Sequence, residues 1–257
     1  MVAGLDKFRE YFKDHPDSYV IIGGTACDLI LDDAGLLARA TQDIDMILVI
    51  EALNRDFVIR FWDFIKDAQY ERKEQSQGKK ILYRFLKPAV TGFPKQIELF
   101  SKIPDVLTLD GSVRLTPIPV DDDLSNLSAI LMDDDYYSYT LTHSTLHGQL
   151  RRANPEALIC LKAYAYLNMI EQREKGEKID ANNIKKHKSD VFRLMLLIPG
   201  DNRDYEVPVS IKASLQSFVN AVKNELPDRK FFKDIGAVDL SADEVFLGFV
   251  ESFGLEP

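Results

Sequence analysis

Three acidic residues beside apolar β segments are the side chains of this 257-residue chain best suited to chemistry. Asp43 and Asp45 open the segment "DIDMILVI", and Glu98 lies within "KQIELFS". Residues two apart in a strand point to one face, so the two aspartates lie together while Ile44 faces the core. Neighbouring carboxylates repel unless a cation offsets their charge, and Mg²⁺ (or Mn²⁺) prefers carboxylate oxygens. With Glu98 on a neighbouring strand, the three acids predict a site for two metal ions; the alternatives are a surface turn and a solvent-facing glutamate.

A glycine pair precedes these acids. Gly23, Gly24 and Thr25 lie between an apolar strand and a short helix. Glycines allow a ligand close to the backbone, and the N–H groups that open a helix favour an anion such as phosphate. With the hydroxyl of Thr41 or Thr25, this segment predicts a phosphate cradle; the alternative is a tight turn in which Thr25 caps the helix.

One cation lies in an otherwise apolar helix. From Ala157 to Ile170, every residue is apolar or Tyr except Lys162 and Asn168. A helix that is apolar on all sides is buried, and a buried ammonium requires an anion. Lys162 is therefore expected to pair with a ligand phosphate or with a carboxylate of the protein.

Basic residues concentrate between positions 173 and 193, although the net charge of −9 argues against nonspecific nucleic-acid binding by the whole surface. This region either forms a local basic face or is a solvated pair of helices, because acids are interspersed. Its cations are Arg173, Lys175, Lys178, Lys185, Lys186, Lys188 and Arg193.

Apolar periodicity and turn residues predict an alternation of strands and helices in the first half. The expected strands cover 18–24, 43–50, 79–88 and 95–101, and the expected helices cover 1–17, 25–35 and 54–70. The segment from Val113 to His143 is predicted to hold further β structure with acidic turns.

The second half is predicted to be helical. Asn154 and Pro155 are typical of a helix start, and Gly176 is typical of a helix end. The expected helices cover 154–176, 181–197, 209–226 and 241–253. We therefore predict a mixed α/β domain over residues 1–150 and a helical domain over residues 151–257.

No apolar run reaches the roughly 18 residues of a membrane span, and no signal peptide opens the sequence. The two cysteines, Cys27 and Cys160, form no CxxC pair and favour reduced thiols over a disulfide framework. We expect a cytoplasmic protein with no membrane partner.

The stretch "GGTACDLI…RATQDIDMILV" resembles the signature of the nucleotidyltransferase superfamily related to DNA polymerase β. The Arg-x-Thr-x-Asp-Ile-Asp order from Arg39 to Asp45 resembles the AbiEii branch, which includes abortive-infection toxins and MenT-type tRNA-modifying toxins. The segment "QIELFSKIPD" resembles the third-acid strand of that branch. "LKAYA" around Lys162 and "KKHKSDVFRL" around Asp190 resemble its two C-terminal motifs.

The resemblance implies a nucleotidyltransferase fold, with a mixed β-sheet in the first domain. It implies Mg²⁺-dependent transfer from a nucleoside triphosphate to an acceptor hydroxyl, with Asp43, Asp45 and Glu98 as metal ligands. Lys162 would neutralise phosphate charge, and Asp190 would orient nucleotide or acceptor. The acceptor would be RNA, tRNA in particular, and an antitoxin protein would be a partner. The alternatives are an adenylyltransferase that modifies a small molecule, as antibiotic-modifying enzymes do, and a non-catalytic nucleotide-binding relative.

Overall fold

A mixed sheet forms the centre of the computed structural model, which describes residues 2–39, 41–72, 83–100, 133–198 and 204–257. Within these residues the sheet has seven strands in the order β3-β4-β5-β2-β1-β7-β6. The strands are β1 (Tyr19–Ile22), β2 (Asp43–Leu48), β3 (Glu71–Arg72), β4 (Tyr83–Leu86), β5 (Gln96–Phe100), β6 (Ser144–His147) and β7 (Leu150–Ala153). The predicted mixed α/β class is therefore confirmed.

Two parallel pairings lie among antiparallel ones. β2 pairs parallel to β5, and β1 pairs parallel to β7. The pairs β1–β2, β3–β4, β4–β5 and β6–β7 are antiparallel. The two central strands, β2 and β1, are flanked on both sides, which explains why their apolar residues are almost completely buried.

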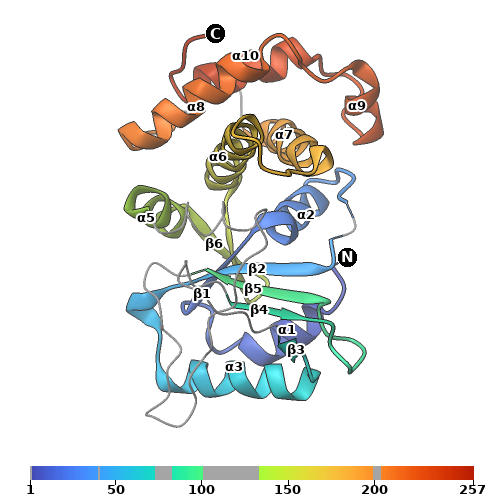
Figure 1. Ribbon diagram of the computed structural model, residues 1–257, viewed down its shortest axis with the longest axis vertical. Helices are drawn as coiled ribbons and strands as arrows, with labels where there is room; N and C mark the ends of the chain where they lie inside the picture. Colours follow the sequence, from blue (N-terminus) through green and yellow to red (C-terminus); the bar gives the residue numbers. More distant parts are fainter. Residues whose placement is uncertain (1, 40, 73–82, 101–132, 199–203) are drawn as a thin grey trace.

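Helices lie on both faces of the sheet, as Figure 1 shows. One face is covered by α1 and α3, which contact each other. On the other face, α2 contacts the strands β1 and β2. The next layer is formed by α6 and α7, which both contact α2. The outermost helices are α8, which contacts α6, and α10, which contacts α7. The helices are α1 (Leu5–Phe12), α2 (Gly23–Asp33), α3 (Arg55–Ala68), α5 (Asp134–Thr142), α6 (Pro155–Glu174), α7 (Ala181–Met195), α8 (Val209–Val222), α9 (Arg229–Asp234) and α10 (Ala242–Ser252), with a short 3-10 turn η1 (Ile50–Ala52).

The layer of α1 and α3 is held by aromatic packing. Asn54 caps α3 through a hydrogen bond from the Phe57 N–H to its Oδ1, at 2.9 Å. Phe57, Phe61 and Phe64 follow at helical spacing, are fully buried, and contact Phe12 of α1 at centroid distances of 5.4 to 6.2 Å. These aromatic residues therefore belong to the core on this face of the sheet.

The prediction of β structure between Val113 and His143 is wrong where the structure describes this segment. Residues 113–132 lie outside the described residues, and Asp134–Thr142 forms the helix α5. Asp133 caps this helix by accepting hydrogen bonds from the Asp135 and Tyr136 N–H groups. Acids at a helix start are stabilising, so the acidic run is a helix N-terminus. The β-like tyrosines after it and Thr140 pack into the core.

The predicted C-terminal helices are confirmed as α6, α7, α8 and α10, whereas the short helix α9 was not predicted. Ser241 starts α10 with a capping box to Glu244. The division into two domains stays a prediction, and the last strand of the sheet, β7, ends at Ala153, just beyond the proposed boundary. Among the described helices, none has the length and apolar character needed to cross a membrane.

Candidate active site

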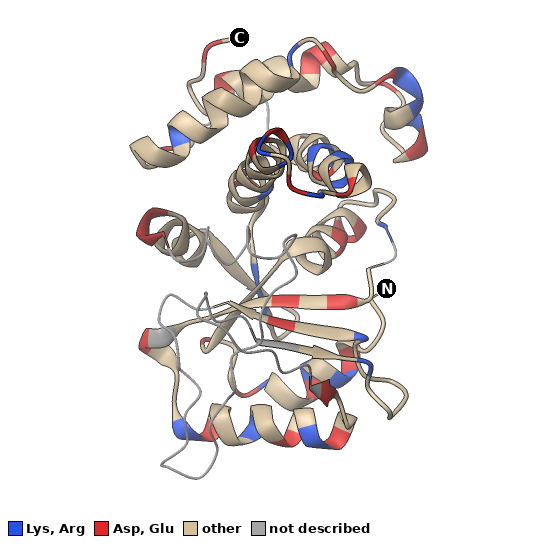
Figure 2. Ribbon diagram, viewed as in Figure 1, with Lys and Arg blue, Asp and Glu red and all other residues tan. Residues whose placement is uncertain are grey.

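Strand register brings the three predicted acids to neighbouring positions. In the parallel pair β2–β5, Asp45 lies opposite Glu98 and Asp43 lies opposite Gln96. Alternation along each strand places these four residues on one face, and Figure 2 shows the acidic positions of the two strands side by side. The residues between them, Ile44 among them, are buried toward α1 and α3. The predicted shared face of the three acids is therefore present in the backbone.

The acidic face meets the beginning of α2. Gly23 has a left-handed backbone, with φ of +68°, and a Cβ atom built on it would lie 1.9 Å from Oδ2 of Asp45. A Cβ atom on Gly24 would lie 3.1 Å from the side chain of Thr41. Both glycines thus allow a side chain from the β2 segment to approach the helix start. The positive end of the α2 dipole stabilises the Asp45 carboxylate placed there.

The two threonine hydroxyls predicted to bind phosphate bond within the protein. The Thr25 hydroxyl donates to the backbone carbonyl of Asp43, which ties α2 to β2. Thr41 donates its N–H to Oδ2 of Asp28 at 3.0 Å, and its side chain also hydrogen bonds to that carboxylate. These contacts position the loop before β2; a phosphate role for either hydroxyl stays a prediction.

Lys162 and Asp190 form a buried ion pair between α6 and α7. Nζ of Lys162 lies 2.9 Å from Oδ2 of Asp190, and both side chains are at most 6% exposed. Arg39, which precedes the Thr41 loop, places a guanidinium nitrogen 2.5 Å from Oδ1 of Asp190 and 2.6 Å from Oδ2. Of the two anions considered for Lys162, the structure supplies the protein carboxylate. Asp190 thereby connects α7 to α6 and to the loop that leads into β2.

These contacts shift the pKa values of the buried groups in compensating directions. Burial acts to raise the pKa of Asp190, but Lys162 and Arg39 outweigh it and hold the pKa below its ordinary value. Burial acts to lower the pKa of Lys162, and Asp190 raises it above the ordinary value. Beside them on α7, burial and the Lys162 charge lower the pKa of His187 to about 3. The pair is thus ionised and His187 is neutral near pH 7.

The three acids do not converge as metal ligands in the described arrangement. Glu98 is buried, and its Oε1 accepts a hydrogen bond from the side-chain amide of Gln96. Nowhere in the described part of the chain do three or more His, Cys, Asp or Glu side chains form a group that could hold a metal ion. The carboxylate oxygens of Asp43, Asp45 and Glu98 are ligands that Mg²⁺ prefers, and the strand register sets the three residues side by side. Their side chains, as described, do not form a group that could hold the ion.

Three residues of this region were not predicted from the sequence: Asp28, Arg39 as an ion-pair partner, and His187. Asp28 stands alone in the apolar run of α2, and that is the same signal that identified Lys162. His187 precedes Asp190 by three residues, one helical turn, so the two share a side of α7. Arg39 lies in a loop, where no periodicity indicates which way its side chain points.

Comparison with protein-family models, with curated proteins and with solved structures gives no match to this chain. The nucleotidyltransferase resemblance therefore stays a hypothesis, and its support comes from the chain's own residues and contacts.

Proposed function

We propose that the protein is a metal-dependent nucleotidyltransferase that transfers a nucleotidyl group from a nucleoside triphosphate to an acceptor hydroxyl. The observation that carries the proposal is the parallel register of β2 and β5, which sets Asp45 beside Glu98 with Asp43 on the same face. The acidic face lies against Gly23 at the start of α2. Oxygen ligands for a divalent cation and N–H groups for a phosphate therefore lie next to each other.

Asp43, Asp45 and Glu98 would hold Mg²⁺ or Mn²⁺, and the bound ion would neutralise charge on the triphosphate. Because Gln96 holds one oxygen of Glu98, metal binding competes with that hydrogen bond. The glycine pair at the start of α2 lets phosphate oxygens approach the backbone N–H groups that have no partner inside the helix. The protein contributes position and electrostatics, which is most of what nucleotidyl transfer demands of it.

Lys162 and Asp190 act on this site by positioning in the described structure. Their ion pair holds α6 against α7, and Arg39 fixes the loop that carries Thr41 to the same carboxylate. For Lys162 to neutralise a phosphate, as the resemblance implies, its ammonium would have to leave Asp190. RNA as acceptor and an antitoxin as partner belong to the same proposal and rest on the resemblance alone.

A second candidate function is nucleotide binding without turnover. It is favoured by the side-chain arrangement, since the described residues gather no group of three metal ligands. A relative that binds a nucleotide at the start of α2 needs the glycine pair but not the three acids.

Asp45→Asn tests the proposal, with Asp32→Asn as the matched control because Asp32 is exposed on α2. The wild-type protein and the control should transfer label from one of the four α-labelled nucleoside triphosphates to total RNA in Mg²⁺, and Asp45→Asn should not. Mn²⁺ binding, measured by electron paramagnetic resonance without nucleotide, should weaken in the same variant. Transfer by Asp45→Asn at the wild-type rate would overturn the proposal, and nucleotide binding without any transfer by the wild type would favour the second candidate. Label on a small acceptor in a cell extract, with none on RNA, would place the acceptor among small molecules.

A further inference from the structure

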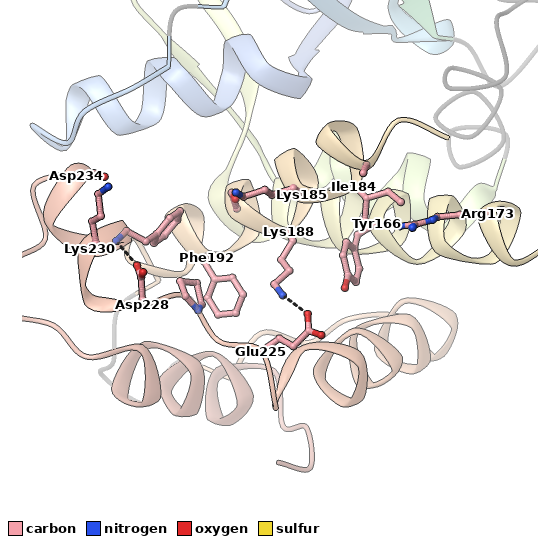
Figure 3. A pocket seen from close by; sticks show the side chains of 14 residues that line it. Tyr166, Arg173, Ile184, Lys185, Lys188, Phe192, Glu225, Asp228, Lys230 and Asp234 are labelled. Carbon is pink, nitrogen blue, oxygen red and sulfur yellow. Dashed lines mark hydrogen bonds and ion pairs between the residues drawn. The ribbon is translucent and has the colours of Figure 1, made fainter. Parts of the chain in front are cut away.

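A pocket lies on the opposite side of α7 from the Lys162–Asp190 pair. It occupies about 600 Å³ between α6, α7 and the segment that leads from α8 into α9, and Figure 3 shows it from close by. Ser189 lines it, whereas its neighbour Asp190 points to the buried ion pair. Sites for small molecules are clefts of roughly 300–1,000 Å³, so this pocket has the size of a ligand site.

The lining combines cations with an apolar floor. Arg173, Lys185, Lys188 and Lys230 line the pocket from α6, α7 and α9. The floor is formed by the almost completely buried Tyr166, Ile184 and Phe192. Three of the four cations, all except Lys230, come from the basic region between positions 173 and 193, which was expected to form either a local basic face or a solvated pair of helices.

Most of the carboxylates in the lining already have partners. Glu225 accepts from Lys188 at 3.1 Å across the pocket, and Asp228 accepts from the N–H of Phe231 at 2.9 Å as the cap of α9. Arg173, Lys185 and Lys230 form no ion pair with any residue in the described part of the chain. Among the described residues, the pocket therefore presents three cations without an ion-pair partner, against the carboxylates of Asp228 and Asp234.

An aromatic ring is available beside these cations. Phe231 lines the pocket and is only partly buried, and the guanidinium of Arg193 lies 5.8 Å from its ring centroid. A partly exposed ring next to lysines is the combination that binds a base by stacking and a phosphate by charge. The exocyclic amino group of a base donates hydrogen bonds, and a carboxylate in the lining, such as that of Asp234, could accept one.

We propose that this pocket binds a nucleotide unit, with the base against Phe231 and the phosphate among Lys185, Lys230 and Arg173. The unit is either a free mononucleotide or one nucleotide of a single-stranded RNA, because both present the same base and phosphate. The proposal does not depend on the proposed transfer activity, since the pocket shares no residue with the acidic face of β2 and β5.

Calorimetric titration in EDTA tests the pocket while leaving out metal-dependent binding at the acidic face. The probes are AMP, adenosine, inorganic phosphate and a short single-stranded oligoadenylate. The test variants are Lys185→Glu and Lys230→Glu, and the matched controls are Lys186→Glu and Lys233→Glu, which are exposed lysines on the same two helices outside the lining.

We expect AMP or the oligonucleotide to bind more tightly than adenosine or phosphate. Each test variant should weaken that binding roughly tenfold or more, because it removes a charge-assisted contact to phosphate. The controls should change it by less than about threefold. If the test variants bind AMP more weakly than the wild type, the pocket is a mononucleotide site. If they weaken only the binding of the oligonucleotide, the pocket holds one nucleotide of a strand. Equal losses in Lys185→Glu and Lys186→Glu, or no binding of either probe by the wild type, would overturn the proposal.

Discussion

The acidic face of β2 and β5 and the buried cluster around Asp190 handle charge in opposite ways. On the strands, backbone register places like charges side by side, Asp45 opposite Glu98. Between the helices, Asp190 lies within 2.9 Å of the charged groups of Lys162 and Arg39. Grouped carboxylates repel each other, whereas a buried ion pair that loses one partner leaves an uncompensated charge.

This difference predicts different costs for removing one charge from each region. On the strands, Asp45 lies opposite Glu98, and Glu98 also lies opposite Arg84 of β4, so like and unlike charges occupy neighbouring positions. Asp190 is the counter-charge of Lys162, which is almost fully buried and whose pKa that carboxylate raises. Substitutions that remove one charge should therefore change the free energy of unfolding in opposite directions in the two regions, or by very different amounts.

The largest effect is expected at the buried pair. Asp190→Asn should lower the free energy of unfolding by about 3–5 kcal/mol, because it leaves the Lys162 ammonium buried without a counter-charge. Urea denaturation followed by far-UV circular dichroism measures this loss. Asp239→Asn, at an exposed position, is the control and should stay within about 0.5 kcal/mol of the wild type.

A double variant shows whether the uncompensated charge is the cause. Lys162→Met with Asp190→Leu removes both charges and keeps similar volumes, so it should recover most of the stability that the single variant loses. Arg39, 29% exposed, can then turn to solvent. A double variant as unstable as Asp190→Asn would mean that packing, not charge, explains the loss.

The next largest effect is expected where the acidic face meets α2. Gly23→Ala should cost about 1–3 kcal/mol more than Gly35→Ala, because its Cβ would overlap Oδ2 of Asp45. Both glycines have positive φ, and nothing lies within 4 Å of a Cβ at Gly35, so the second variant measures backbone strain alone. Thermal unfolding compares the two. Asp45→Ala removes Oδ2 and Cγ but keeps a Cβ atom 3.0 Å away, so most of the extra cost should disappear in that background. An extra cost that stays unchanged there would contradict the described approach of Asp45 to the helix.

Periodicity and capping residues allowed most of the fold to be predicted. The helices α3, α6, α7 and α10 follow from apolar spacing, and the bounds of α6 follow also from Asn154, Pro155 and Gly176, since these signals are local. Helix α5 could not be read this way, because its tyrosines and threonines favour strands, and packing of Tyr136 and Tyr137 against the core overrides that preference.

The candidate site was predictable in part for the same reason. Alternation placed Asp43 and Asp45 on one face, and an isolated charge in an apolar helix identified Lys162. The partners were not predictable, because the register of β5 against β2 and the contact between Lys162 and Asp190 join residues far apart in sequence. The identity of an anion beside a buried lysine is decided by tertiary packing, which local patterns do not contain.

An intermediate effect is expected from acid at His187, the neutral member of the buried cluster. A folded pKa of about 3 means that the unfolded chain, with a histidine pKa near 6.5, binds a proton that the folded chain does not. The stability from this group is therefore complete above about pH 6.5 and is lost as the pH falls toward 3. Between about pH 7 and pH 5, wild type should lose about 2 kcal/mol of unfolding free energy through this residue.

Urea denaturation at the two pH values, on wild type and His187→Gln, measures that contribution. The variant should lose less stability on acidification, and His147→Gln, which removes an exposed histidine, should follow the wild type. If His187→Gln shows the full wild-type decline, then the buried cluster does not hold this ring neutral, and the contrast with the strands weakens.

The smallest effect is expected from Asp45→Asn. Removing one of two like charges on neighbouring strands should stabilise the fold by about 0.2–1 kcal/mol, while loss of an anion at the start of α2 should cost a similar amount. The free energy of unfolding should therefore be unchanged or slightly higher, with Asp32→Asn as the control. Urea denaturation of both variants, run beside Asp190→Asn, compares an acid at a site with an acid in an ion pair on one scale. An acid that serves to bind a cation contributes little stability until that cation is bound. If Asp45→Asn lost as much unfolding free energy as Asp190→Asn, the strand carboxylates would therefore be structural charges of the fold.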